Sequence, residues 1–117
     1  MEIKAITIPE LSKKPFEVRT SIRNMKRMFD YQLAVAKVSD ELDDNDVVGQ
    51  ISASLKGLDE TLAFVRAVLD LDDDAYEKLL DLDSERVQKI SEKITGYMLG
   101  LSDEQLAESK GEESPKE

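Results

Sequence analysis

The chain has 117 residues, enough for one hydrophobic core, and carries a net charge of -10 at pH 7. It contains no cysteine, which excludes disulfides and thiolate metal sites, and no histidine, which removes the commonest general base and metal ligand. Since only carboxylates, lysines and tyrosines remain for acid–base chemistry, we expect a protein that is not an enzyme and that binds no cofactor and no metal.

The two ends of the chain differ in charge. Residues 1–37 hold eight Lys/Arg and four Asp/Glu, whereas residues 38–117 hold eight Lys/Arg and 22 Asp/Glu. The N-terminus, MEIKAITIPEL, is too short and too polar for a signal peptide, and no apolar segment approaches the roughly 20 residues of a membrane span. We therefore expect an intracellular protein that does not contact a membrane.

The first predicted elements are a short extended segment over residues 3–8 and a helix over 16–42. Residues 3–8 are rich in β-branched side chains, and Pro15 suits the first turn of a helix that follows it. Within 16–42 the apolar residues recur every three or four positions, which is typical of one helix face. They are Val18, Ile22, Met25, Phe29, Leu33 and Ala36.

A second long helix is predicted over residues 46–70, with Asn45 or Asp46 as its N-cap. Its apolar pattern is the most regular in the chain and predicts the most buried helix. Gly49 and Gly57 fall inside this helix, and we expect another helix to pack closely against them. The pattern consists of Val47, Ile51, Leu55, Leu58, Leu62, Val65 and Leu69.

Two shorter helices are predicted over 74–81 and 84–100, the first capped by the acidic run from Asp72 and the second ended by Gly100. A capping-box pattern at 102–105 predicts one further turn or two. Residues 109–117 contain no large apolar residue and predict a disordered charged tail. The predicted fold class is therefore all-α, with a single domain of four to five helices over 1–108, a short extended N-terminal segment and a disordered acidic C-terminal tail.

One acidic segment has part of the spacing of a calcium-binding loop. Asp70, Asp72, Asp74 and Asp81 occupy positions 1, 3, 5 and 12, but Ala75 stands where the sharp turn requires glycine. The segment also continues directly into a helical pattern. Acidic residues at a helix start, favoured by capping and by the helix dipole, explain it better.

The candidate partner-binding residues lie in the basic segment, residues 18–29, whose sequence is VRTSIRNMKRMF. Its four cations fall at positions i, i+4, i+7 and i+8 of the predicted helix and would share one face. Nucleic-acid binding is disfavoured because the chain is acidic overall. Two alternatives remain open: a solvated face, or a face that meets an acidic surface on another copy or on a client protein. The four cations are Arg19, Arg23, Lys26 and Arg27.

Adaptable apolar residues accompany these cations. Met25, Met28 and Phe29 could belong to a groove that accepts partners or to an ordinary core. An acidic remainder and a basic end within one molecule favour head-to-tail association, which generates rings or open spirals.

The order of these features resembles the tail assembly chaperones of long-tailed phages (siphophages) of Gram-positive bacteria. The resemblance covers residues 1–101. It depends on the basic helix VRTSIRNMKRMFDYQLAVAKV, the segment LDETLAFVRAVLDLDDDAYEKLLDL and the segment ERVQKISEKITGYMLG.

The resemblance implies a non-enzymatic chaperone in the host cell cytoplasm. Such proteins bind the tape measure protein, help to recruit tail-tube subunits, and are absent from the mature virion. The alternative function is that of an acidic regulator or inhibitor, which mimics nucleic acid and occupies a basic site on another protein.

Overall fold

The structure is a computed structural model that describes residues 3–40 and 46–100. In chain order its elements are β1 (Ile3–Ile6), β2 (Phe16–Arg19), α1 (Ile22–Asp40), α2 (Val47–Leu69), α3 (Asp73–Leu80) and α4 (Ser84–Met98). Four helices and a short two-stranded sheet at the N-terminal end confirm the predicted all-α class and the single domain. The predicted turn at 102–105 and the tail at 109–117 lie outside the described residues.

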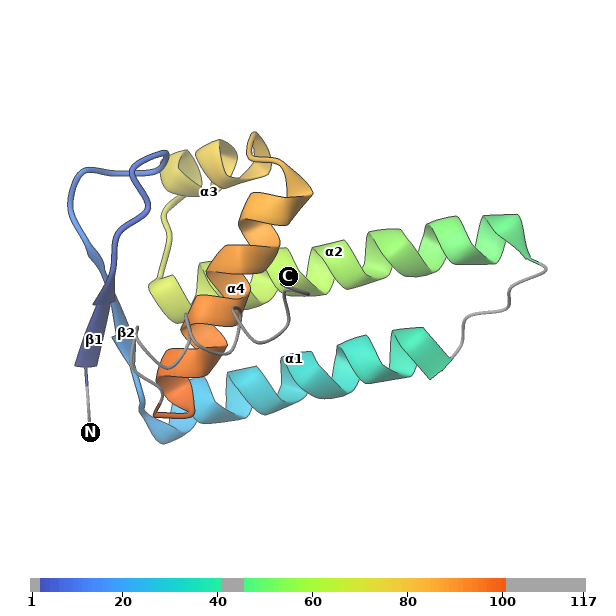
Figure 1. Ribbon diagram of the computed structural model, residues 1–117, viewed down its shortest axis with the longest axis horizontal. Coiled ribbons are helices and arrows are strands. Elements are labelled where there is room, and N and C mark those ends of the chain that lie inside the picture. Colours follow the sequence, from blue (N-terminus) through green and yellow to red (C-terminus); the bar gives the residue numbers. More distant parts are fainter. Residues whose placement is uncertain (1–2, 41–45, 101–117) are drawn as a thin grey trace, which may run out of the picture.

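The molecule consists of a long α1–α2 hairpin with a second layer packed over one end of it. α1 and α2 lie side by side, and α4 crosses α2 in the half nearest the sheet (Figure 1). α3 lies at the opposite edge of the molecule from α1 (Figure 1). The half of the hairpin that contains the end of α1 and the start of α2 extends beyond α4.

The predicted helix 16–42 is wrong at its start. Residues 16–19 form β2, which pairs antiparallel with β1 so that Ile6 lies opposite Phe16 and Lys4 opposite Val18. Side chains alternate along β2: Val18 is fully buried, whereas Glu17 and Arg19 are exposed. The helix starts after Ser21, whose Oγ accepts a hydrogen bond from the backbone N–H of Asn24 (3.2 Å).

The other helices lie close to their predicted bounds because their caps are encoded locally. Asp46, Asp72 and Asp83 precede α2, α3 and α4, and each side chain accepts a hydrogen bond from the backbone N–H three residues later. Gly100, at φ 87°, donates to the carbonyl oxygen of Tyr97 (3.0 Å) and follows the end of α4 as predicted.

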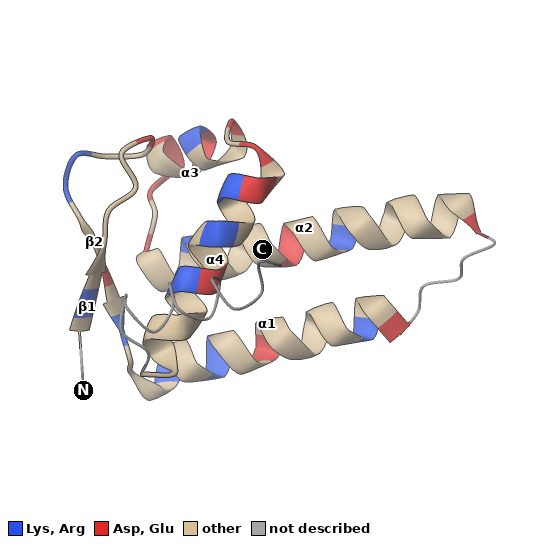
Figure 2. Ribbon diagram, in the orientation of Figure 1, with Lys and Arg blue, Asp and Glu red and all other residues tan. Residues whose placement is uncertain are grey.

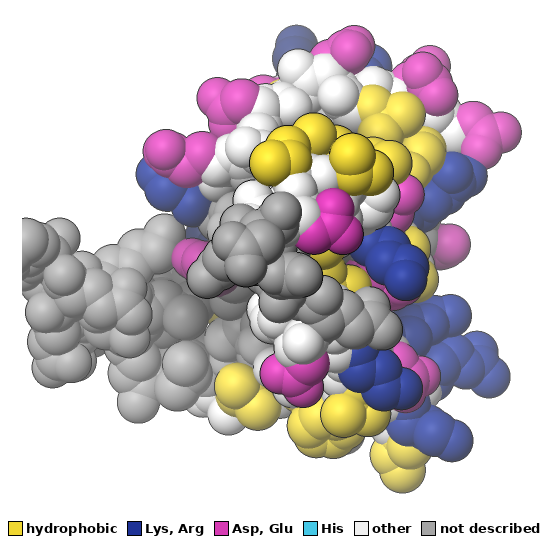
Figure 3. Space-filling view, turned by 90° about the vertical axis from the view of Figure 1, so that its right-hand side faces the viewer, with side chains coloured by type: hydrophobic (Ala, Val, Ile, Leu, Met, Phe, Trp, Pro, Cys, Tyr) yellow, Lys and Arg dark blue, Asp and Glu magenta, His cyan; other side chains and the backbone are white. Residues whose placement is uncertain are grey.

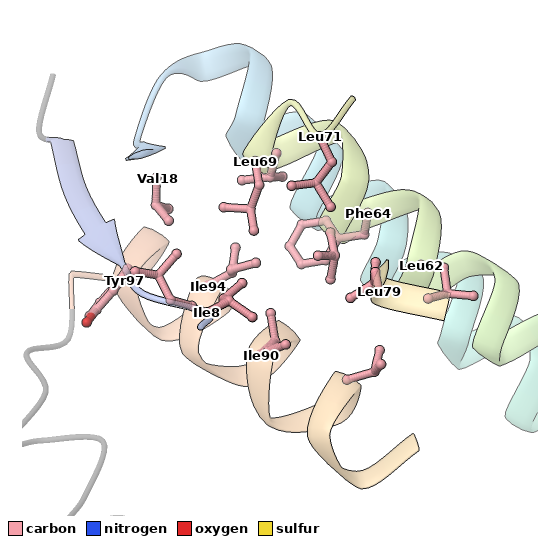
Figure 4. Close-up of a cluster of buried hydrophobic side chains, with 14 of the residues drawn as sticks. Ile8, Val18, Leu62, Phe64, Leu69, Leu71, Leu79, Ile90, Ile94 and Tyr97 are labelled. Carbon is pink, nitrogen blue, oxygen red and sulfur yellow. The ribbon is translucent and has the colours of Figure 1, made fainter. Parts of the chain in front are cut away.

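The core lies where the sheet, the second half of α2 and α4 meet (Figure 4). Ile8 from the N-terminal segment packs among Ile90 and Ile94 of α4, opposite Leu69 and Phe64 of α2. Phe64 also stacks on Tyr31 of α1, with ring centroids 4.5 Å apart, and so joins the hairpin to the core.

The prediction that the helix over 46–70 is the most buried holds for only half of it. Every residue of α2 that is buried lies between Thr61 and Leu69. The expected close packing at its glycines is also wrong. A Cβ at Gly57 would have no neighbour within 4 Å, and one at Gly49 would meet only the capping side chain of Asp46.

Candidate partner-binding surface

The structure divides the predicted partner-binding residues among several environments. Arg19 is on β2 rather than on α1, and its Nη2 forms an exposed ion pair with Oε1 of Glu17 (3.0 Å). It therefore does not share a helix face with Arg23, Lys26 and Arg27, because the chain is extended up to residue 19.

Arg27 makes contacts within the molecule. Its Nη1 donates to Oδ1 of Asn24 (2.9 Å) and to the carbonyl oxygen of Ala67 in α2 (3.1 Å). Asn24 is buried, and its Nδ2 donates to the carbonyl oxygen of Arg19 (2.9 Å). These bonds connect the end of β2, the first turns of α1 and the last turns of α2, so Arg27 has a structural role.

The two methionines belong to the core. Met28 is fully buried, and Met25 is partly buried and packs against the core cluster. Met28 therefore cannot contact a partner at the surface, and its place among the predicted partner-binding residues is corrected. Met28 is buried because it lies on the face of α1 that packs against α2. The same face carries Asn24, which is also buried, and Tyr31, three residues after Met28.

The opposite face of α1 is exposed and combines apolar with cationic side chains. Phe29 is 48% exposed and Leu33 is 60% exposed, although both belong to the apolar pattern that predicted the buried face. Residues on this face are spaced four, three, four and four positions apart, so they form one row along the helix. We call it the α1 outer row: Ile22, Lys26, Phe29, Leu33 and Lys37.

A second exposed apolar row lies on α2, in the half that α4 does not cover. Ile51 is 65% exposed and Leu55 is 59% exposed. These residues extend, at helical spacing, the series Leu62, Val65 and Leu69, which is buried in the core. We call this exposed part the α2 apolar row: Val48, Ile51, Leu55 and Leu58.

The exposure of the α2 apolar row follows from the lengths of the helices. α2 has 23 residues and α4 has 15, which at 1.5 Å per residue correspond to about 35 Å and about 22 Å. α4 also crosses α2 instead of running along it (Figure 1). Part of α2 therefore stays uncovered. The sequence indicates the difference in helix length but not the crossing.

Figure 3 views the molecule from the end of the hairpin. In this view hydrophobic side chains lie on the surface in separate upper and lower groups, and cationic side chains lie mostly along the right-hand side. Within the described residues no helix is long and apolar enough to cross a membrane.

The acidic residues at 70–83 have local structural roles. Asp72 and Asp83 are helix caps, Asp70 takes the left-handed conformation that ends α2, and Asp73 pairs with Arg66 (2.6 Å). Among residues 3–40 and 46–100, no three carboxylates are placed to hold a metal ion.

The chain matches one family model, described as "Phage tail assembly chaperone proteins, TAC", over residues 1–114. No curated protein and no solved structure matches it. Because the family model covers nearly the whole chain, the protein belongs to the family of phage tail assembly chaperones.

Proposed function

We propose that this chaperone binds the tape measure protein in the host cell cytoplasm during tail assembly, self-associates around it, and is absent from the mature virion. The tail-tube protein is a further proposed partner. Family membership supports a role in tail assembly, without enzymatic chemistry. The observation that carries the client proposal is the α2 apolar row, which continues the buried series of α2 into the half of the helix that α4 does not cover.

The α2 apolar row suits an apolar, helical client. Its side chains are spaced like those that pack against α4 further along the same helix, so a client helix could lie on the part of α2 that α4 does not cover. A surface of this kind on a monomer marks an interaction site, because burying its apolar area stabilises a complex by a free energy of roughly 25 cal/mol per Å². The net charge of -10 would keep such a complex soluble.

The first prediction concerns this row. In the double variant I51S/L55S we expect most of the tape measure protein to become insoluble on co-expression, because the variant loses apolar contact area with the client. The measurement is the soluble fraction of the tape measure protein and its co-purification with the chaperone.

The matched control is I3S/L99S, which changes two apolar residues of similar exposure, one in β1 and one directly after α4. Circular dichroism should show that both variants remain folded, since all four side chains are already exposed. Equal solubilisation by I51S/L55S and wild type would refute the client site, and equal loss in I3S/L99S would show that the effect is not specific to the row.

A further inference from the structure

The α1 outer row combines two properties that a solvated face does not need. Three of its side chains are large and apolar, and Ile22, at 79%, is the most exposed large hydrophobic residue that the structure describes. On the same face, Lys26 lies between Ile22 and Phe29, and Lys37 follows Leu33. We propose that the α1 outer row binds the acidic surface of α3 on a second copy of this chain.

Charge complementarity identifies the second copy as the occupant. α1 carries four Lys/Arg and two Asp/Glu, although the whole chain has a net charge of -10. The segment 70–85, which contains α3, carries eight Asp/Glu and one lysine. Repulsion between such acidic monomers opposes assembly unless a local cationic face meets a local acidic one.

The surface of α3 also offers an apolar contact. Leu80 is 44% exposed, and Glu77 and Asp81 lie three residues before it and one residue after it. An exposed leucine beside two carboxylates complements a row in which Phe29 and Leu33 lie beside lysines. The α3 acidic surface is defined here as Glu77, Leu80 and Asp81.

The positions of the two surfaces determine the type of assembly. α1 and α3 lie at opposite edges of the molecule, with α2 between them (Figure 2). A contact between different surfaces at opposite edges is heterologous, so each copy still has one surface free after binding. Such contacts generate open chains, or rings where the rotation closes.

This inference deepens the self-association in the proposed function, but it uses a different surface from the client site. The α2 apolar row shares no residue with the α1 outer row or with the α3 acidic surface. Oligomer formation can therefore be measured on the purified full chain without a client, and client solubilisation can be measured separately.

The second prediction tests the interface by charge reversal. We expect wild type to self-associate at low salt, with an association constant that falls as salt rises from about 0.05 to 0.5 M because the contact is screened. K26E/K37E and E77K/D81K should each weaken self-association about tenfold or more, because each places like charges opposite each other. Analytical ultracentrifugation of the purified proteins measures these constants.

The decisive measurement is an equimolar mixture of the two variants. In the mixture the reversed α1 surface meets the reversed α3 surface, and the two unreversed surfaces also meet, so association should return to near the wild-type level. The control K13E/K56E makes the same change in net charge at exposed lysines outside the row and should associate like wild type.

Several results would overturn the proposal. These are a monomeric wild type at low salt, wild-type association by K26E/K37E, equal weakening by K13E/K56E, or no recovery in the mixture. If I51S/L55S loses the client while the mixture recovers, both sites stand. If the client is held normally but charge reversal has no effect, only this interface fails.

Discussion

Asn24 is the polar residue around which the basic segment is organised. It is 6% exposed and holds the carbonyl oxygen of Arg19 and the guanidinium of Arg27, so both of its polar groups are satisfied. Residue spacing predicted that four cations share one helix face, which is wrong for Arg19 because the strand at 16–19 moves the start of the helix past it. Spacing also did not predict which cation would contact α2, because that depends on how the two helices pack.

The third prediction compares the contributions of Arg27 and Arg23 to the stability of the fold. R27A should lower the free energy of unfolding by about 1–2 kcal/mol, because it removes two hydrogen bonds and leaves the buried Asn24 amide oxygen without its donor. R23A, at an exposed position of the same helix, should change it by less than about 0.5 kcal/mol. Urea unfolding of both variants provides the comparison, and equal effects would contradict a structural role for Arg27.

At the scale of the elements, local signals explain most of what could be predicted. Caps at Asp46, Asp72 and Asp83 and the glycine at 100 defined the ends of three helices, because each acts through backbone groups within a few residues. β2 was missed because Val18 fits both a helical row and an alternating strand. Only pairing with β1, through contacts distant along the chain, decides between them.

The fourth prediction concerns the two glycines of α2. G57A should raise the free energy of unfolding by about 0.5–1 kcal/mol, because the new methyl meets nothing within 4 Å and alanine is the better helix former. G49A is the matched control. Its methyl would lie 2.5 Å from Oδ2 of Asp46, so it should disturb the N-cap and fail to stabilise. Thermal unfolding measures both, and a destabilised G57A would show that the position is packed after all.

At the scale of the whole molecule, the two apolar rows are exposed because α4 covers only part of the α1–α2 hairpin. Periodicity predicts which residues share a face of α2, but coverage depends on how far a third helix extends along the hairpin. The same applies to the α1 outer row, which has an apolar pattern and no helix packed on it within the described residues. The sequence therefore predicted part of the cationic face, whereas the exposure of the apolar rows could be found only from the tertiary arrangement.

Sequence periodicity also could not predict an ion pair between residues far apart in the chain. Arg86 of α4 donates from Nε to Oε2 of Glu10 (2.8 Å) and from Nη2 to Oε1 (3.1 Å), across 76 positions of the chain. This bidentate pair connects the segment between β1 and β2 to α4. The hydrogen bonds from Arg86 hold the pKa of the Glu10 carboxyl below its ordinary value, because they favour the charged form.

The fifth prediction follows from the sign of that shift. Because the pKa of Glu10 is lower in the folded chain than in the unfolded chain, its stabilising effect is complete above the ordinary glutamate pKa of about 4.3 and is lost as pH falls through the lower folded value. A double-mutant cycle with E10Q, R86Q and the combined variant should give a coupling energy of less than about 1 kcal/mol at pH 7, because both side chains are partly exposed. The coupling should disappear at a pH below the folded pKa, where the carboxyl is neutral. Urea unfolding at the two pH values measures it, and a coupling that persists in acid would show that packing rather than charge joins these segments.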